Sequence, residues 1–531
     1  MNIIIFTQKY FQNKIKLLIY IVLSVGLGVI PLVSNYILGN IIDKINNIVN
    51  IKEIYYLLLI YFTSLIITII IRFINGLLYN KLQVSASYKM NEFVLEHVKR
   101  LPIKFLKDID LIYLNQRINN DVNNLTIFFI GLLSDIITNI FTVLFMFYIM
   151  FSINKSIICI FIIITILYTL LYNIMKKRIF SCNITFQERQ SEYFSRLNEQ
   201  IYNIKFIKTH VLFEVLRKRL KITFDSLLLS IMKMTKNKLV FSSVESTITS
   251  IAQVIFIFVI AIAVIEGKIT IGLFSILISY FSTLINSLKY FIGVGENYQE
   301  NLGSFNRLID LINISKENNG ELRISKFNSI EIKNLNFLYN ESYVFKNFNY
   351  RFEKGKVYCI VGRNGSGKST LLNLINGLYI DDLVGAINYD NISIKDLDMY
   401  YMRQNIIGVT EQEPLLLKGT IKDNLILNNN NVDFELLENL IDCFGIRNII
   451  DNVLDEKNST VSGGEKQKIS LIRLLLKQPQ ILILDEPTSA LDKDSIEEFK
   501  KIVISLKLEK IIIIVTHDKE IIDISDEVLS L

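Results

Sequence analysis

The sequence contains few of the side chains from which disulfide frameworks and zinc centres are built. Among 531 residues there are three histidines and four cysteines, and the cysteines are Cys159, Cys182, Cys359 and Cys443. No two of them form a CxxC pair, so neither a disulfide scaffold nor a zinc framework is expected. Cys359 lies in an apolar run and is expected to be a small core residue.

A large excess of charge is also absent. The net charge is +6 over the whole chain, which is too small for this length to indicate nucleic acid as a partner. No cleavable signal peptide is expected, because the first apolar stretch is long enough to span a bilayer.

Apolar residues, in contrast, are abundant and unevenly distributed. The chain is 51% hydrophobic and 20% charged, with a mean hydropathy of +0.38. Nearly all of the apolar excess lies before residue 293, and after residue 301 the composition is that of a soluble α/β domain. A chain of this length and division is expected to hold two or more domains.

Six apolar segments in the first part have the length of transmembrane helices. Short loops join them in pairs, whereas long polar stretches separate the second from the third and the fourth from the fifth. The alternative, a set of buried core helices, is disfavoured by the lengths and by the charge distribution. The predicted spans cover residues 16–39, 54–78, 126–151, 156–175, 245–265 and 271–293.

Lysine and arginine are concentrated in both long stretches and before the first span. The positive-inside rule therefore puts both termini and both long connections on the cytoplasmic side of the membrane. The long stretches have helical periodicity, so the spans are expected to continue as helices beyond the bilayer. Arg72 and Lys289 are expected to snorkel at the membrane boundary, and neither they nor Glu245 is assigned as a substrate ligand.

A glycine-rich loop in the second part follows the apolar run 357–361 and precedes the helix-forming run 370–375. Strand, loop and helix in this order form the context of a P-loop, whose backbone amides wrap nucleotide phosphates. Its lysine is expected to reach the β- and γ-phosphates, and the serine after it to coordinate Mg²⁺. The loop residues are Gly362, Arg363, Asn364, Gly365, Ser366, Gly367, Lys368 and Ser369, followed by Thr370.

Two further apolar runs end in polar side chains that suit such a site. The run 481–484 is followed by Asp485, where a Walker-B aspartate meets the magnesium shell, and by Glu486, placed to polarise a water. The run 511–515 ends just before His517, a candidate sensor of the γ-phosphate.

A second glycine-containing segment places small residues and bare amides before a helix-forming run. This arrangement presents amides and a helix dipole to an anion. A single nucleotide site in one domain needs only one such phosphate-binding segment, or cradle, whereas the P-loop and this segment make two. The segment consists of Val461, Ser462, Gly463, Gly464 and Glu465.

Together these motifs resemble those of an ABC exporter in the half-transporter form. The segment 461–465 resembles the family signature, with Val461 for the usual leucine and Glu465 for the usual glutamine. The resemblance implies an all-α membrane domain of six transmembrane helices, followed by an α/β P-loop NTPase domain with ABC-specific subdomains. The predicted ranges are 1–310 for the membrane domain, 311–327 for a linker and 328–531 for the nucleotide-binding domain.

The resemblance also implies roles for individual residues. Tyr339 matches the aromatic residue that stacks on adenine, Gln412 the Q-loop glutamine and Asp492 the D-loop. ATP and Mg²⁺ are the implied ligands, and the P-loop residues, Ser462 to Glu465, Tyr339 and Asp492 would contact the nucleotide. The implied catalytic residues are Glu486, His517 and Gln412, and the implied metal ligands are Ser369, Gln412 and Asp485.

The membrane half carries the same resemblance. The segments 101–122 and 199–219 are similar to the family's two long intracellular connections, each of which holds a short coupling helix that docks on a nucleotide-binding domain. One departure lies before the signature. The usual Gly-Glu-x-Gly motif is replaced there by Asp455-Glu456-Lys457-Asn458, which keeps the glutamate and loses the glycines.

The resemblance implies a dimer in which each ATP lies between the P-loop of one chain and the signature of the other. A homodimer is favoured over a heterodimer. The expected function is ATP-driven export from the cytoplasm by alternating access, in a multi-pass protein of the plasma membrane. The nucleotide-binding domain and both termini are expected to be cytoplasmic.

Several alternatives stay open. A membrane-bound ABC ATPase that senses a ligand and signals without net transport is the alternative function. A soluble ABC ATPase acting on nucleic acid and an importer both fit the sequence poorly. The Ile-, Asn- and Lys-rich composition suggests an AT-rich bacterial genome. The first span begins too near the N-terminus for a leader-cleaving peptidase domain, so peptide (including bacteriocin), antibiotic, lipid and drug export all remain possible.

Overall fold

The computed structural model describes residues 3–11, 13–46, 51–108, 111–153, 155–339, 342–427, 432–454 and 461–531. The chain divides into two compact units. The first comprises Met1–Glu96 and Ile112–Asn313, and the second comprises His97–Leu111 and Ile314–Leu531.

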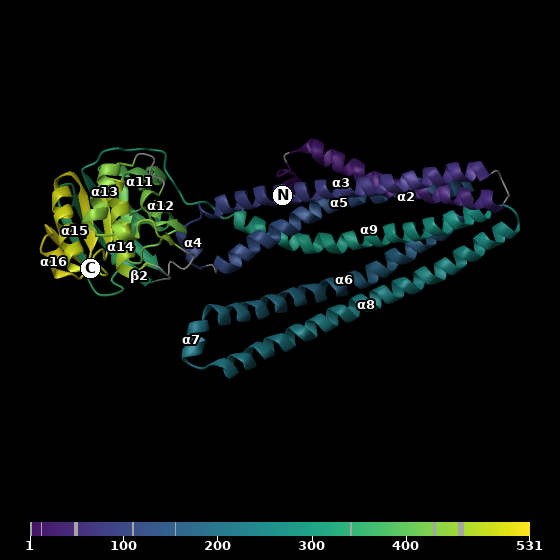
Figure 1. Cartoon of the computed structure of the whole chain (residues 1–531). Coiled ribbons are helices and arrows are strands. Elements are labelled where there is room, and N and C mark those ends of the chain that lie inside the picture. Colours follow the sequence, from purple (N-terminus) through teal and green to yellow (C-terminus); the bar gives the residue numbers. More distant parts are fainter. Residues whose placement is uncertain are drawn as a thin grey trace. The chain divides into compact units, whose positions relative to one another are not determined.

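The first unit consists of helices. Its long helices α6 and α8 run side by side as a hairpin that the short helix α7 closes (Figure 1). Helices α3 and α8 have 48 and 53 residues, far more than a bilayer requires, as the periodicity of the long connections predicted. The helices are α1 (Ile3–Gln8), α2 (Lys14–Asn46), α3 (Ile51–Val98), α5 (Leu111–Ile153), α6 (Lys155–Tyr202), α7 (Ile204–Thr209), α8 (Phe213–Ile265) and α9 (Ile271–Ile312).

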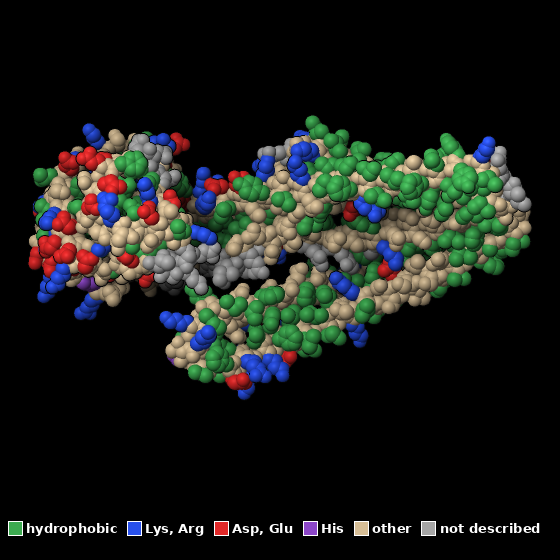
Figure 2. All heavy atoms as spheres, in the orientation of Figure 1, with side chains coloured by type: hydrophobic (Ala, Val, Ile, Leu, Met, Phe, Trp, Pro, Cys, Tyr) green, Lys and Arg blue, Asp and Glu red, His purple; other side chains and the backbone are tan. Residues whose placement is uncertain are grey.

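Within the described residues, five helices are long and apolar enough to cross a membrane. Figure 2 shows apolar side chains spread over the surface of the long helices, and Leu59, Ile70 and Phe73 of α3 are among those exposed. Five of the six ranges predicted as spans lie within these helices, which are Lys14–Asn46, Ile51–Val98, Ile118–Phe151, Phe213–Ile265 and Ile271–Gly295. The range 156–175 falls in α6, where the first side chains lie outside the described residues.

Polar side chains join helices of the first unit across their apolar faces. The Asn35 amide of α2 donates to the Ser279 hydroxyl of α9 at 2.6 Å. Lys289, expected to snorkel, lies 3.4 Å from the Glu245 carboxylate, so these two charges pair with each other. Such pairing lowers the cost of charged groups in an apolar environment.

A five-stranded parallel sheet, in the order β11-β3-β10-β9-β6, forms the centre of the second unit. Alternate residues of its strands point to opposite faces, and both faces are buried, which explains the continuous apolar runs in the sequence. Among the elements that pack on it are the helices α10 (Lys368–Ile375), α14 (Gly463–Leu476) and α15 (Lys493–Leu506). The strands are β3 (Val357–Val361), β6 (Ile407–Thr410), β9 (Ile481–Asp485), β10 (Ile511–Val515) and β11 (Glu527–Ser530).

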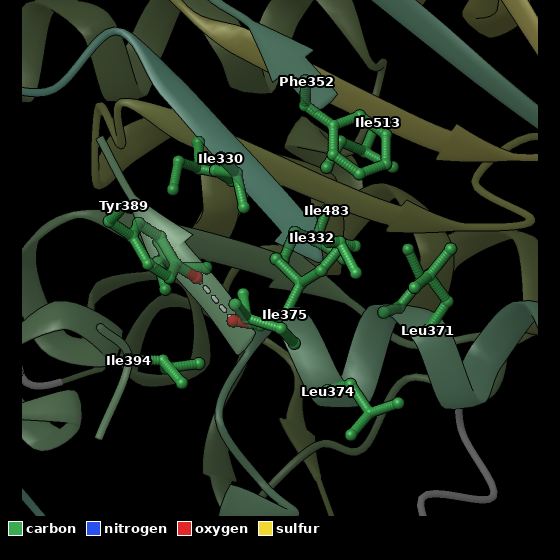
Figure 3. Close-up of a cluster of buried hydrophobic side chains, with 14 of the residues drawn as sticks. Ile330, Ile332, Phe352, Leu371, Leu374, Ile375, Tyr389, Ile394, Ile483 and Ile513 are labelled. Carbon is green, nitrogen blue, oxygen red and sulfur yellow. Dashed lines mark hydrogen bonds between the residues drawn. The ribbon is translucent and has the colours of Figure 1, made fainter. Parts of the chain in front are cut away.

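The core on one face of this sheet is filled by an antiparallel sheet of order β2-β1-β4-β5 and by α10. Figure 3 shows Ile483 and Ile513 of the parallel sheet beside Ile332 of the antiparallel sheet. The buried Tyr389 hydroxyl donates to the Ile375 carbonyl at the end of α10. The strands are β1 (Ser329–Tyr339), β2 (Ser342–Glu353), β4 (Val384–Tyr389) and β5 (Ile392–Ser393).

The other elements of the second unit are short. A two-stranded sheet pairs β7 (Gly419–Thr420) with β8 (Val453–Leu454). The helices are α10 (Lys368–Ile375), α11 (Met399–Asn405), α12 (Ile421–Ile426), α13 (Phe434–Cys443), α14 (Gly463–Leu476), α15 (Lys493–Leu506) and α16 (Lys519–Ile522), with 3₁₀ turns η1 (Ile380–Asp382), η2 (Arg447–Ile449) and η3 (Lys507–Glu509).

One helix of the second unit comes from early in the sequence. Helix α4 (Ile103–Asp108) packs its Ile103 against the apolar core of this unit. The sequence prediction assigned this segment to a membrane domain of residues 1–310, whereas the structure groups His97–Leu111 with the later residues. The residues Asp455 to Asn458, where the signature region departs from the family motif, lie outside the described residues.

Candidate nucleotide-binding and hydrolysis site

The P-loop runs from the end of β3 into α10, as the sequence predicted. Gly365 and Gly367 have φ angles of +84° and +102°, in the left-handed region that favours glycine. A Cβ atom on Gly367 would lie 2.5 Å from the Val344 Cγ1 atom, so this position also needs the absence of a side chain. The chain can therefore turn tightly and present its amides at the start of α10.

Two buried polar groups lie within this loop. The Lys368 ammonium donates to the carbonyl oxygens of Gly362 at 2.7 Å and Arg363 at 3.2 Å. The Ser366 hydroxyl is buried and has no hydrogen-bond partner among the described residues. A buried hydroxyl without a partner, beside an ammonium and a helix N-terminus, fits a phosphate group.

Asp485 ends β9 beside the P-loop. Burial raises the pKa of its carboxyl group, while the hydroxyl of Ser369 and the ammonium of Lys368 act in the opposite direction by stabilising the charged form. Ser369 and Asp485 are thus brought together across 116 positions of sequence (485 minus 369). A hydroxyl and a carboxylate oxygen are the kind of ligands that Mg²⁺ takes, so this pair fits a magnesium site.

Glu486 follows with an unusual backbone conformation. Its φ angle is +48°, and its backbone N–H donates to the Val515 carbonyl of β10 at 2.8 Å. The Glu486 carboxylate accepts a hydrogen bond of 3.1 Å from the side-chain amide of Gln412, just beyond β6. Strained backbone held by neighbouring strands is common at functional sites, and here it aims the carboxylate toward the Q-loop.

His517 lies beyond the end of β10 and is exposed. In the part of the chain that the structure describes, no hydrogen bond joins it to Glu486 or the P-loop. Its neighbour Asp518 accepts a hydrogen bond from the Thr488 hydroxyl at 3.1 Å, which ties the two loops after β9 and β10 together. The sequence-predicted residues thus all lie at or just beyond the carboxyl ends of the parallel strands, where open α/β sheets bind ligands; they are Asp485, Glu486, Gln412 and His517.

The signature segment forms the N-terminus of α14. Ser462 caps this helix and Glu465 reaches back, its carboxylate accepting from the Ser462 backbone N–H at 2.7 Å. A Cβ on Gly464 would lie 2.6 Å from the Ala490 carbonyl oxygen, whereas a Cβ on Gly463 would meet no atom within 4 Å. Gly464 therefore allows α14 to pack closely against the Ala490 backbone, whereas Gly463 faces open space.

Two residues of α14 that sequence reasoning missed connect the signature helix to Glu486 and Asp492. Gln467 is buried, and its amide donates to the Glu486 backbone carbonyl at 3.5 Å. Lys468 pairs with Asp492 at 2.6 Å, and Asp492 also caps α15 by accepting from the Ser495 N–H. Gln467 lies at helical spacing from buried residues such as Ser470 and Leu471. This spacing is the sequence pattern that could have indicated its burial.

Tyr339 ends β1 within a group of aromatic rings. Its ring centroid lies 5.0 Å from that of Phe337 and 5.8 Å from that of Tyr379. Burial raises the pKa of Tyr339 to about 12, so the phenol is neutral near pH 7. Tyr379 was not predicted from the sequence, which offers no local pattern that marks it.

The P-loop and the signature segment have their polar contacts within their own neighbourhoods in the described part of the chain. Among the described residues, no hydrogen bond or ion pair joins residues 362–369 to residues 461–465.

Comparison with known proteins identifies the family. A family model described as the ABC transporter transmembrane region matches residues 17–288, which is more than half of the chain. A second model, described as ABC transporter, matches residues 345–489. This chain belongs to the ABC transporter family. The resemblance inferred from the P-loop, signature and Walker-B residues is thereby confirmed at the level of family.

Curated relatives of this ABC transporter include eukaryotic and bacterial proteins. ABC transporter B family member 1 of Dictyostelium discoideum is 30% identical over 295 residues, covering 52% of this chain and 32% of the relative. The ATP-dependent lipid A-core flippase of Photobacterium profundum is 25% identical over 368 residues, covering 67% of this chain and 63% of the relative. The matched region thus spans less than two thirds of either relative.

A solved structure of a bacterial Atm1-family ABC exporter with ATP bound has the same fold. It matches with a TM-score of 0.85 and 17% sequence identity, covering 97% of this chain and 93% of that chain. The likeness confirms the predicted fold class, a helical membrane domain followed by a P-loop domain of ABC type.

Proposed function

We propose that this ABC transporter is an ATP-driven exporter built as a half-transporter. The observation that carries the proposal is the Gln412–Glu486 hydrogen bond beside Asp485 and the P-loop, in a chain whose other unit contains five membrane-length helices among its described residues. A water-activating carboxylate held next to a phosphate cradle is what ATP hydrolysis requires.

ATP is the proposed nucleotide, with its phosphates on the P-loop. The Lys368 ammonium would exchange its bonds to the loop carbonyls for phosphate oxygens, and Ser366 would gain a partner. Tyr339 would stack on the adenine ring. Ser369 and Asp485, with Gln412, would hold Mg²⁺, which when bound neutralises charge on the phosphate oxygens.

Hydrolysis would proceed through Glu486. Its carboxylate accepts from Gln412 and would take a proton from the attacking water, while the φ strain at this residue keeps the carboxylate aimed. His517 would contact the γ-phosphate from the end of β10. ATP binding would favour the closed state and its cleavage would remove that preference.

A second chain would complete each site. The open space around Gly463 supports a head-to-tail dimer in which Ser462 to Glu465 and the region of Asp492 face the partner's nucleotide. A homodimer is the simplest form, in the plasma membrane with the nucleotide-binding unit and both termini cytoplasmic.

The substrate is proposed as an amphiphile drawn from peptides, lipids or drug-like molecules. The lipid A-core flippases among the relatives support the lipid class. Nothing on the described residues favours signalling without transport, so that alternative is not proposed.

The test uses the purified chain in proteoliposomes that contain a fluorescent phospholipid. Wild type is expected to hydrolyse MgATP and to move the label between leaflets, whereas Glu486→Gln should lose hydrolysis by about 100-fold or more while still binding ATP as a dimer. Glu498→Gln, on the surface of α15, is the control. Near-normal hydrolysis in Glu486→Gln would overturn the assignment of the base. Hydrolysis with no movement of lipid, peptide or dye would overturn export.

A further inference from the structure

Helix α4 is fixed to the second unit by both apolar and charged contacts. Ile103 packs against the core that includes Tyr379 and Leu383. The Lys104 ammonium lies 2.8 Å from the Asp382 carboxylate. The preceding residue, Asp381, accepts from the Asn318 backbone N–H at 3.4 Å, so η1 anchors both α4 and the segment after α9.

Lys107, one turn further along α4, reaches the aromatic group around Tyr339. Its ammonium donates to the Tyr379 hydroxyl at 2.7 Å. The same nitrogen lies 5.8 Å from the centroid of the Tyr339 ring and 5.4 Å from that of Tyr379. The distance to the Tyr339 centroid falls within the range of cation–π attraction, whereas the contact with Tyr379 is the hydrogen bond to its hydroxyl at the ring edge.

The Tyr339 ring is thereby held on several sides. Tyr379 meets it edge-on, with an interplanar angle of 88°, and Phe337 does so at 89°. Because Lys107 bonds to Tyr379 and lies over Tyr339 at once, it fixes the relation between these two rings. Loss of the ammonium removes one of the contacts that fix the Tyr339 ring.

We propose that Lys107 is a positioning residue, which holds Tyr339 in the orientation that receives the nucleotide base. The seating of α4, meaning its packing against the rest of the second unit, is thereby linked to the affinity for the nucleotide. The proposal rests on the proposed function, in which Tyr339 stacks on adenine. Linkage is reciprocal: if the seated α4 tightens ATP binding by some factor, bound ATP stabilises the seated α4 by the same factor.

The first experiment is a double-mutant cycle on the full chain, with the KM and kcat of ATP hydrolysis as readouts. Lys107→Met removes the charge and keeps the length, and it is expected to raise the KM for ATP about two- to fivefold, the effect of one cation–π contact. The kcat should stay within about twofold, and Lys107→Arg should restore the wild-type KM. In a Tyr339→Ala background, Lys107→Met should add nothing.

A matched control is available on β2. Lys346 lies over the Tyr343 ring at 4.6 Å, so Lys346→Met removes the same kind of contact without touching Tyr339. Its KM should equal that of wild type. Additive effects of Lys107→Met and Tyr339→Ala, or an unchanged KM in Lys107→Met, would overturn the proposal. If Tyr339→Ala itself left the KM for ATP unchanged, the result would contradict the proposed stacking of adenine on Tyr339 instead.

The second experiment measures the reverse direction of the linkage. Ile103→Cys reports the seating of α4, because Ile103 packs against the unit, and its alkylation rate is read by mass spectrometry of that peptide. In a Glu486→Gln background, ATP is expected to slow the labelling about two- to fivefold, and Lys107→Met should abolish the effect. Labelling that ATP does not change, or that slows equally without Lys107, would contradict the linkage.

Discussion

The side-chain amide of Gln412 donates a hydrogen bond of 3.1 Å to the carboxylate of Glu486. The two residues come from different strand ends, β6 and β9, which are neighbours in the parallel sheet. Glu486 cannot swing freely, because its backbone is tied to β10 and its carboxylate to Gln412. The orientation of the proposed base thus depends on a residue 74 positions earlier in the chain.

Removal of this donor should slow hydrolysis and spare binding. A hydrogen bond to a charged group contributes about 1.5–3 kcal/mol, so Gln412→Ala is expected to lower kcat by roughly 10- to 100-fold. ATP binding, measured with a fluorescent analogue, should change little, and Glu413→Ala at the exposed neighbouring position is the control. A kcat in Gln412→Ala equal to that of wild type would show that Glu486 is oriented by its backbone alone.

The Lys468–Asp492 pair predicts a pH dependence of stability. The hydrogen bond from Lys468, together with that from Ser495, holds the pKa of Asp492 well below its usual range. A carboxyl group with a lowered folded-state pKa stabilises the protein above its unfolded value of about 3.9, and the contribution is lost as the pH falls through the folded-state pKa. Lys468→Met should therefore lower the melting temperature at pH 7.

The size of this effect is limited because Asp492 is more than half exposed. An exposed pair contributes at most about 1 kcal/mol, so the expected loss is no more than roughly 2–4 °C. The difference between wild type and variant should shrink as the pH is lowered from about 4 towards 2. A difference that stays constant over this range would assign the effect to packing of the lysine stem.

The two signature glycines predict opposite behaviour for one added methyl group. Gly464→Ala places a Cβ 2.6 Å from the Ala490 carbonyl, so it should destabilise the folded chain by about 1–3 kcal/mol. Gly463→Ala meets no atom within 4 Å and should leave the melting temperature unchanged or slightly raised.

If a partner's nucleotide contacts Gly463, the Gly463→Ala variant should nevertheless hydrolyse ATP more slowly than wild type. Thermal unfolding and ATPase assays on the same samples separate the two effects. Full ATPase activity in Gly463→Ala would count against a site completed by the second chain.

The cysteines predict a pattern of thiol reactivity. Burial raises the pKa of the Cys359 thiol to about 11, so it stays protonated and unreactive between pH 7 and 9. Cys443 is exposed. Alkylation followed by mass spectrometry should therefore label Cys443 at least about tenfold faster than Cys359 until denaturant is added. Equal rates in the native protein would mean that β3 opens readily.

Features with a local signature were predictable from the sequence. The apolar run 511–515 coincides with β10, and the P-loop helix begins within two residues of its predicted start at 370. Apolar runs, glycines and strand-end carboxylates report on their own neighbourhood, so the strands β3, β9 and β10 and the helix after the P-loop were predicted directly.

Contacts between distant segments were not predictable. The sequence predicts Gln467 and Lys468 only as part of a helix. In the structure, Gln467 donates to the Glu486 backbone carbonyl and Lys468 pairs with the Asp492 carboxylate. Lys107 and Tyr379 are 272 positions apart, and each looks ordinary in its local sequence. Such pairs depend on how elements pack, which no single-sequence pattern encodes.

The grouping of His97–Leu111 with the later residues has a consequence for biosynthesis. Tyr379, which binds Lys107, is made 272 residues after it. At about 5–20 residues per second, α4 waits roughly 15–55 seconds for its docking surface to emerge from the ribosome. Helix α4 must therefore stay unpartnered while the later helices of the first unit are synthesised, so the second unit cannot reach its final form before the chain is nearly complete.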